Sequence, residues 1–150
     1  MKWFSYIVGL LLLVIDQLVK SAVSNQIALG TVKSFIPGVL SLTNLRNDGA
    51  AWSILSGNQI FFYLITVVAL VVLIYLLVTQ RQHLLYQWGL TLMITGTLGN
   101  FIDRIRLKYV VDMFQIDFFN FPIFNIADMC LTFGVIILFI AIIRDERIEG

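Results

Sequence analysis

Four long apolar stretches constrain the fold of this chain more than any other feature of its sequence. A helix needs about 20 mostly apolar residues to cross the hydrocarbon core of a bilayer. Four segments approach that length: 3–23, 60–78, 84–102 and 123–143. Hydrophobic residues make up 59% of the 150 residues and charged residues only 13%, and a soluble domain of this size has too little interior to hide so much apolar surface. We therefore predict a single membrane-embedded domain over residues 1–150.

The first apolar stretch has an alternative interpretation as a cleaved signal peptide. Lys2 precedes it, and Ala22-Val23-Ser24 resembles a cleavage site. Asp16 and Lys20 argue against this interpretation, because the apolar region of a signal peptide is uncharged. Their spacing of four places both side chains on one face of a helix. We favour a transmembrane helix.

Two longer segments separate the predicted spans, and with four spans both lie on the side of the membrane opposite the termini. Residues 25–58 alternate loosely in polarity and contain the turn signal Pro37-Gly38, whereas residues 105–122 are rich in β-branched and aromatic types. Both segments favour short strands or surface-lying structure at the membrane interface. The predicted fold class is therefore all-α and membrane-embedded, with four transmembrane helices and a small β-rich element at the surface.

The charged, histidine and cysteine residues exclude several classes of function. A net charge of +1 without a basic tract predicts no nucleic-acid partner. One cysteine, Cys130, and one histidine, His83, provide neither an intrachain disulfide nor a metal-ligand cluster. We predict no metal and no cofactor.

Lysine and arginine residues leave the orientation of the chain in the membrane undecided. The terminal side carries Lys2, Arg81, Arg144 and Arg147, and the other side carries Lys20, Lys33, Arg46, Arg104, Arg106 and Lys108. Taken literally, the preference for positive charge on the cytoplasmic side would place the termini outside. Lys20 and Arg104 belong to polar clusters near the span ends, so the count decides little.

Ionisable and amide side chains gather at one end of the predicted spans. An ionisable residue inside a span costs about 2.5–3.5 kcal/mol on insertion scales and is a functional candidate by default. Three spans carry such residues at the same end: Asp16, Lys20, Asn100, Asp103, Arg104, Asn125 and Asp128. The segments on that side add Asn47, Asp48 and Asp112. These residues converge on one membrane face, whereas 60–78 contains nothing ionisable and is predicted to be a lipid-facing support.

Residue spacing adds local geometry to this cluster. Asn125 and Asp128 are three apart and are predicted to lie one above the other on a helix. Gly96 and Gly99 keep the third span thin, so that a neighbour or a substrate backbone can approach it. The small residues that begin at Gly49 predict a turn suited to close approach by another chain.

Carboxylates are the remaining candidates for chemistry. The sequence offers no serine with a nearby histidine, no partner base for Cys130 and no phosphate-binding loop. Two adjacent carboxylates share one proton, so one can act as base and the other as acid in peptide hydrolysis. The residues alone leave three functions open: a peptidase, a proton or ion conductor, and a structural bundle. They also leave open which two aspartates pair.

Five sequence boxes resemble those of the bacterial lipoprotein signal peptidases, the type II signal peptidases. In the order of that family they are Asp16-Gln17-Leu18-Val19-Lys20, Asn47-Asp48-Gly49-Ala50-Ala51-Trp52, Gly96 to Arg104, Val110-Val111-Asp112 and Phe124-Asn125-Ile126-Ala127-Asp128. Together they cover essentially the whole chain and form a highly specific set. Thr95 stands where a glycine is common, and Met113 where phenylalanine is usual; neither replaces a carboxylate.

The resemblance implies a membrane aspartic endopeptidase. Members of that family remove the signal peptide of prolipoproteins before a diacylglyceryl-modified cysteine, without metal or cofactor, and globomycin-like peptides inhibit them. The two catalytic aspartates correspond to Asp112 and Asp128. The family also implies a bacterial inner-membrane location with cytoplasmic termini and an active site near the outer face. The alternative is a four-helix protein that conducts protons or ions.

The remaining motif residues have predicted supporting roles. Asn125 orients Asp128 or binds the substrate backbone. Residues expected to grip the substrate are Asn47, Asn100 and Arg104, and the turn at Gly49-Ala50 is expected to act as a lid. Asp16, Lys20 and Asp103 are expected to hold the helices in register. Trp52 and the aromatic segment 114–121 are expected to border the lipid chains of the substrate.

Overall fold

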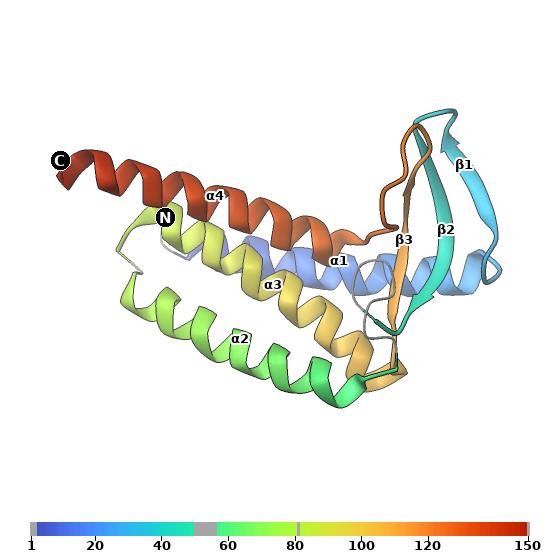
Figure 1. Ribbon diagram of the computed structural model, residues 1–150, viewed down its shortest axis with the longest axis horizontal. Coiled ribbons are helices and arrows are strands. Elements are labelled where there is room, and N and C mark those ends of the chain that lie inside the picture. The colour runs from blue at the N-terminus through green and yellow to red at the C-terminus, as the bar shows by residue number, and fades with distance from the viewer. Residues whose placement is uncertain (1–2, 50–56, 81, 150) are drawn as a thin grey trace.

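The computed structural model describes residues 3–49, 57–80 and 82–149, which form four helices and three strands. The helices are α1 (Phe4–Gln26), α2 (Gln59–Thr79), α3 (Leu84–Leu107) and α4 (Ile126–Glu149), and the strands are β1 (Val32–Ile36), β2 (Leu40–Asn47) and β3 (Val110–Ile116). The helices run alongside one another and the sheet stands across one end of the bundle, while α1 begins and α4 ends at the opposite end (Figure 1).

Three of these helices are long and apolar enough to cross a membrane, judged by length and composition over the described residues. They comprise Phe4–Gln26, Gln59–Thr79 and Ile126–Arg144. Helix α3 is of similar length but more polar, because it contributes Gln87, Asn100 and Asp103 to the protein interior. The prediction of four helices is confirmed, whereas the prediction that all four cross the membrane remains a prediction.

Helix α3 is the centre of the bundle and packs against α1, α2 and α4. Its glycines make this possible. A Cβ atom added at Gly96 would overlap the carbonyl oxygen of Ala127 in α4, and one at Gly99 would lie 2.7 Å from Oδ2 of Asp16 in α1. The prediction that these glycines keep the helix thin is confirmed, and here the neighbours that approach are helices of the same chain.

The helix ends differ from the predicted boundaries in ways that matter for the site. Helix α3 continues to Leu107 and ends where Lys108 adopts a left-handed conformation with φ of 69°. Residues 105–107, which were predicted to begin the surface segment, are therefore helical. Helix α4 begins only at Ile126. Asn125 therefore precedes the helix, and the prediction that it stacks on Asp128 within one helix is wrong, because the chain enters α4 with Asn125 as its capping residue.

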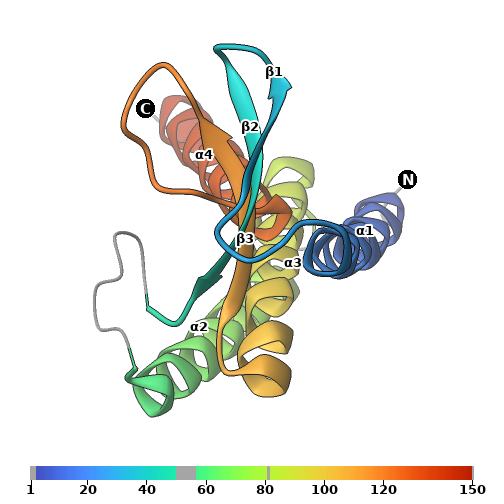
Figure 2. The same ribbon diagram turned by 90° about the vertical axis from the view of Figure 1, so that its right-hand side faces the viewer.

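The sheet is antiparallel with the strand order β1-β2-β3 and confirms the prediction of short strands. Gly38, with φ of 73°, lies in the turn between β1 and β2. Side chains alternate across β3, so Val111 and Met113 share one face and Asp112 points to the other. Val111 and Met113 are buried in a core cluster with Val23 and Ile27. Strand β3 is thereby held against α1, which lies beside it in Figure 2, and Asp112 points away from α1 toward Asn47 and Asn125.

Candidate active site

Asp112 lies in the middle of β3 and is 2% exposed. Its two carboxylate oxygens accept hydrogen bonds from two amide side chains. Nδ2 of Asn47, at the end of the neighbouring strand β2, donates to Oδ2 at 2.9 Å, and Nδ2 of Asn125 donates to Oδ1 at 2.7 Å. These bonds hold the carboxylate in a defined orientation at the edge of the sheet.

Asp128 lies in the first turn of α4 and is held by a capping box. Its backbone N–H donates to Oδ1 of Asn125 at 2.9 Å, and the backbone N–H of Asn125 donates to Oδ2 of Asp128 at 3.1 Å. Nδ2 of Asn100 in α3 donates to the other carboxylate oxygen at 2.7 Å. A negative charge at this position is also favoured by the dipole of α4.

Asn125 joins the two aspartates. It is completely buried, and it donates its side-chain amide to Asp112 and its backbone amide to Asp128. Burial raises the pKa of Asp112 to about 7, and the charge of Asp128 adds to the increase, while the hydrogen bonds from Asn47 and Asn125 oppose it. The two carboxylates are therefore able to retain one shared proton near neutral pH.

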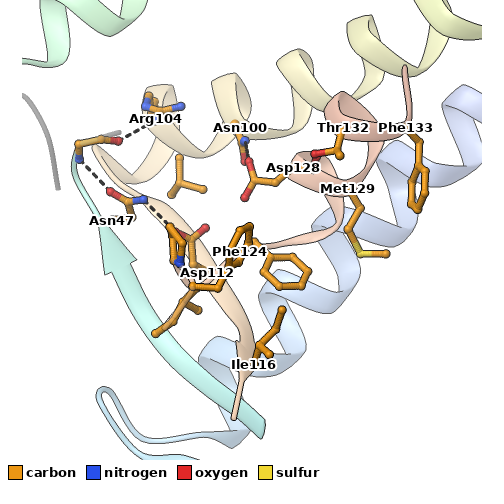
Figure 3. Close-up of a pocket in the computed structure, with 15 residues that line it drawn as sticks. Asn47, Asn100, Arg104, Asp112, Ile116, Phe124, Asp128, Met129, Thr132 and Phe133 are labelled. Carbon is orange, nitrogen blue, oxygen red and sulfur yellow. Dashed lines mark hydrogen bonds between the residues drawn. The ribbon is translucent and has the colours of Figure 1, made fainter. Parts of the chain in front are cut away.

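Both carboxylates line one pocket of about 560 Å³ (Figure 3). Its polar end is formed by Asn47, Gly49, Asn100, Arg104, Asp112 and Asp128, and its apolar part by Val110, Ile116, Phe121, Pro122, Ile123, Phe124, Met129 and Phe133, with Thr132 beside them. Sequence reasoning missed Met129, Thr132 and Phe133. Thr132 follows Asp128 by one helical turn and Phe133 follows Met129 by one turn, which is the spacing signal that could have identified them.

Arg104 forms the edge of the pocket nearest to α2. Its Nη2 donates to the carbonyl oxygen of Gly49 at 3.0 Å, and its guanidinium lies 4.7 Å from the ring centroid of Phe62. Its Nε is buried and has no hydrogen-bond partner among the described residues. The N–H of Gly49 in turn donates to Oδ1 of Asn47 at 3.0 Å. The turn after β2 therefore connects Arg104 to Asn47, which donates a hydrogen bond to Asp112.

Helix α2 takes a larger part in the site than the sequence suggested. Besides the contact of Phe62 with Arg104, the hydroxyl of Tyr63 donates to the backbone carbonyl of Arg104 at 2.9 Å. Most of α2 is exposed and only Phe62 and Leu73 are buried in it, which agrees with the prediction of a lipid-facing support. The prediction did not include the aromatic contacts with the last turns of α3, because aromatic side chains carry no distinct signal inside an apolar run.

Three other predicted residues form a separate cluster behind the pocket. The ammonium of Lys20 lies 2.9 Å from Oδ2 of Asp16 and 3.0 Å from Oδ2 of Asp103, and all three side chains are nearly inaccessible. Asp16 also accepts from the N–H of Ala127 at 2.9 Å, and Asp103 from the N–H of Val111 at 3.2 Å. The cluster thus fastens the start of α4 and of β3 to the helices.

Gln17 belongs to this second cluster and was not singled out from the sequence. Its Nε2 donates to Asp16, to the carbonyl oxygen of Gly99 and to Asp103, each at 3.1 Å. Lys20 connects the cluster to the pocket by donating to Oδ1 of Asn100 at 3.1 Å. The residues predicted as a lid and a lipid border, Ala50 and Trp52, lie outside the described residues.

Comparison with known proteins identifies relatives of this chain over nearly its whole length. A sequence model of the family described as signal peptidase (SPase) II matches residues 8–144. The lipoprotein signal peptidase of Lactiplantibacillus plantarum is 58% identical over 98% of this chain and 99% of its own length. That of Enterococcus faecalis is 54% identical over 95% of this chain and 89% of its own.

Solved structures match the fold closely. A bacterial membrane enzyme structure determined by the in meso method at 2.3 Å superimposes with a TM-score of 0.93, at 37% identity, covering 98% of this chain and 92% of the other. A second bacterial membrane enzyme, determined at 1.9 Å, gives a TM-score of 0.88 at 39% identity over 95% of this chain and 94% of the other. The four-helix and three-strand arrangement is therefore shared with membrane enzymes.

Proposed function

The chain belongs to the signal peptidase II family, and we propose that it is an aspartic endopeptidase that uses Asp112 and Asp128 to remove the signal peptide from diacylglyceryl-modified prolipoproteins. The observation that carries the assignment of the two aspartates is Asn125. A single buried residue donates hydrogen bonds to both carboxylates, and both line the same pocket. Such a pair is equipped to exchange one proton during peptide hydrolysis.

The proposed reaction uses one ionised and one protonated carboxylate. The ionised group accepts a proton from a water molecule whose oxygen attacks the scissile carbonyl carbon. The protonated group donates its proton to the leaving amide nitrogen, and the carbon–nitrogen bond breaks. Each carboxylate oxygen of Asp112 and Asp128 already accepts one hydrogen bond, which leaves one lone pair per oxygen for these transfers. Because the two groups titrate as a pair, base and acid are not assigned individually.

The rest of the pocket supplies functions that binding requires. Arg104 lines the polar end of the pocket, and the guanidinium of an arginine carries several N–H donors that suit a substrate carbonyl oxygen. Asn47 and Asn100 face the pocket and complete the polar end. The apolar part, with Phe121, Met129 and Phe133, suits the acyl chains that the modified cysteine carries.

We further propose that all four helices cross the inner membrane of a bacterium, with cytoplasmic termini and the sheet at the outer face. The polarity of α3 supports this placement, because its interior polar side chains bond within the protein and need no contact with lipid. Globomycin-like peptides are expected to compete with the substrate for the same pocket.

The test is a processing assay on a lipid-modified prolipoprotein with Asp112→Asn and Asp128→Asn made separately. Each substitution keeps the size of the side chain and removes its ability to accept or hold the shared proton. We expect each to lower the turnover rate by about 10²–10⁴-fold, the usual contribution of a general acid or base. Circular dichroism and thermal unfolding of the purified protein establish that each variant is folded.

Asp117→Asn is the matched control. Asp117 also lies on the sheet side of the protein, but its carboxylate accepts from the hydroxyl of Ser41 and does not line the pocket. This variant is expected to cleave at the wild-type rate. A folded Asp112→Asn or Asp128→Asn variant that cleaves as fast as the control would disprove the assignment of the two catalytic residues.

A further inference from the structure

A second pocket of about 160 Å³ lies on the other face of β3. Val111 lines it, whereas the neighbouring Asp112 lines the active-site pocket, and alternation along the strand separates the two. The last turn of α1 contributes Ser21, Ser24 and Asn25 to it, and α3 contributes Arg106. Figure 2 shows α1 on this side of β3.

The accessible groups of this pocket are hydrogen-bond donors and cations. Asp103 also lines it, but its carboxylate is 3% exposed and accepts from Lys20, Gln17 and the N–H of Val111. Arg106 is exposed and forms no ion pair with any described residue. Arg46, also exposed, extends over the ring of Tyr109 at 4.9 Å from its centroid, and Tyr109 lines the pocket.

Two arginines counteract the local electrostatic features that disfavour an anion. The helices α1 and α3 both end here, and their C-terminal dipoles disfavour negative charge. Arg106 lies in the last turn of α3 and offsets its dipole, and Arg46 adds a second positive charge from the sheet. A guanidinium also matches the geometry of phosphate oxygens, which the hydroxyls of Ser21 and Ser24 complement.

The exposed surface of α1 changes from apolar to polar where it reaches the pocket. Leu11, Val14 and Leu18 are exposed along one side of the helix, Leu18 at 64%. Ser21 and Asn25 follow Leu18 at helical spacing on the same side and are exposed. In a helix that crosses a bilayer, this transition coincides with the boundary between acyl chains and headgroups.

We propose that this pocket binds the phosphate group of an anionic phospholipid from the outer leaflet, with the acyl chains along the exposed apolar side of α1. The continuity of the polar pocket with that apolar side favours a lipid over free phosphate. The site gives a role to two of the six Lys and Arg residues at this end of the bundle, Arg46 and Arg106. Arg46 and Arg106 are ligands for lipid at a surface where positive charge is otherwise unusual.

The experiment titrates the purified full-length protein in detergent with phosphatidylglycerol and, separately, with phosphatidylcholine of identical acyl chains. Lipid retention by native mass spectrometry and the shift in thermal unfolding temperature report binding. We expect phosphatidylglycerol to bind more tightly. Arg106→Gln is expected to weaken that binding about fivefold, and the double variant Arg46→Gln/Arg106→Gln about 25-fold, at the usual contribution of one basic residue near an anionic lipid.

Two further variants separate a local site from a general effect of charge. Lys33→Gln removes one positive charge from the same end of the protein outside the pocket and is expected to bind phosphatidylglycerol like wild type. Arg106→Lys keeps the charge and is expected to retain most of the affinity. The prolipoprotein-processing rate in detergent shows that Arg106→Gln is folded, because Arg106 is outside the active-site pocket.

Three outcomes would overturn the proposal. One is equal affinity for the two lipids in the wild-type protein. Another is an equal loss of affinity in Lys33→Gln and Arg106→Gln, which would indicate a diffuse effect of net charge. The third is a thermal shift with millimolar inorganic phosphate as large as that with phosphatidylglycerol, which would indicate an anion site without lipid specificity.

Discussion

Two clusters of buried aspartates lie side by side in this protein and differ in the partners of their carboxylates. Asp112 and Asp128 line a pocket and, among the described residues, accept hydrogen bonds only from amide N–H groups, whereas Asp16 and Asp103 lie behind the pocket on either side of Lys20. Asn100 connects the clusters, since it donates to Asp128 and accepts from Lys20.

The difference shows how one residue type serves two purposes in a membrane protein. A buried carboxylate needs a partner that stabilises its charge, or else it retains a proton. Lys20 provides that partner for Asp16 and Asp103, which leaves them suited to holding helices together. Asp112 and Asp128 have amide donors and form no ion pair with any described residue, and burial raises the pKa of Asp112 so that it holds a proton more readily. Substitutions that exchange or remove these partners test the comparison directly.

The largest expected effect on stability comes from Lys20→Met. This change leaves two carboxylates buried without their shared cation, and breaking a buried ion pair by removing one partner costs about 3–5 kcal/mol. Thermal or denaturant unfolding in detergent measures the loss. Lys33→Met, at an exposed lysine on β1, is the matched control and should unfold like wild type. Equal stability of Lys20→Met and the control would show that the second cluster is not structural.

The same Asp→Asn substitution should act differently in the two clusters. Asp103→Asn removes a charged acceptor of Lys20 and is expected to lower the free energy of unfolding by about 1.5–3 kcal/mol, the usual range for a hydrogen bond to a charged group. Asp112→Asn removes a carboxylate whose ionised form is disfavoured by burial, and should leave the free energy of unfolding at neutral pH unchanged or higher. The free energies of unfolding of both variants are measured at neutral pH. A lower value for Asp112→Asn than for Asp103→Asn would contradict the prediction.

The pH dependence of cleavage should report the proton held by the pocket pair. Because the pKa of Asp112 is raised to about 7, turnover is expected to fall as pH rises through about 7 and both carboxylates become ionised. Asn47→Ala removes a hydrogen bond that favours the ionised form. The decline should therefore move to higher pH. Ser41→Ala, which removes a donor to Asp117 outside the pocket, should leave the pH profile in place.

The free energy of unfolding should also depend on the titration of Asp112, and it should fall as pH rises, whereas a typical aspartate with a lowered pKa makes it rise. The pKa of Asp112 is higher in the folded protein than its ordinary value of 3.8, so the folded state binds more protons between about pH 4 and 7. The contribution of Asp112 to stability is present at the acid end of this range and is lost toward pH 7. Asp112→Asn should remove this slope from a plot of unfolding free energy against pH; a slope that persists in the variant would assign it to another group.

The smallest effect is expected at Cys130, a buried thiol in α4 that belongs to neither cluster. Cys130→Ala shortens a packed side chain by one sulfur atom and should cost about 1 kcal/mol of stability. The rate of prolipoprotein processing should not change. A large loss of rate in a folded Cys130→Ala variant would mean that the thiol takes part in the site.

Much of the fold could be predicted because membrane proteins show their architecture in composition. The four apolar stretches locate α1, α2, α3 and α4, and the β-branched and aromatic segments locate the strands. The boundaries were less accurate, since helix ends depend on capping. Asn125 ends the preceding loop because it exchanges hydrogen bonds with Asp128. The apolar run around it does not show where the helix begins. The part played by Phe62 and Tyr63 was equally hidden within an apolar stretch.

The sequence by itself determined the membrane character of the chain, the end of the bundle that carries its polar residues and, through five motif boxes, its family. It did not determine which aspartates lie in the same hydrogen-bonded cluster. That was decided by the tertiary structure, because close packing at Gly96 and Gly99 brings α1 and α4 against α3 and places Lys20 between Asp16 and Asp103. The pleat of β3 turns Asp112 the other way, toward Asn125 and Asp128. Hydrogen bonds act over about 3 Å, so only the packed helices and strand could assign each carboxylate to its partner.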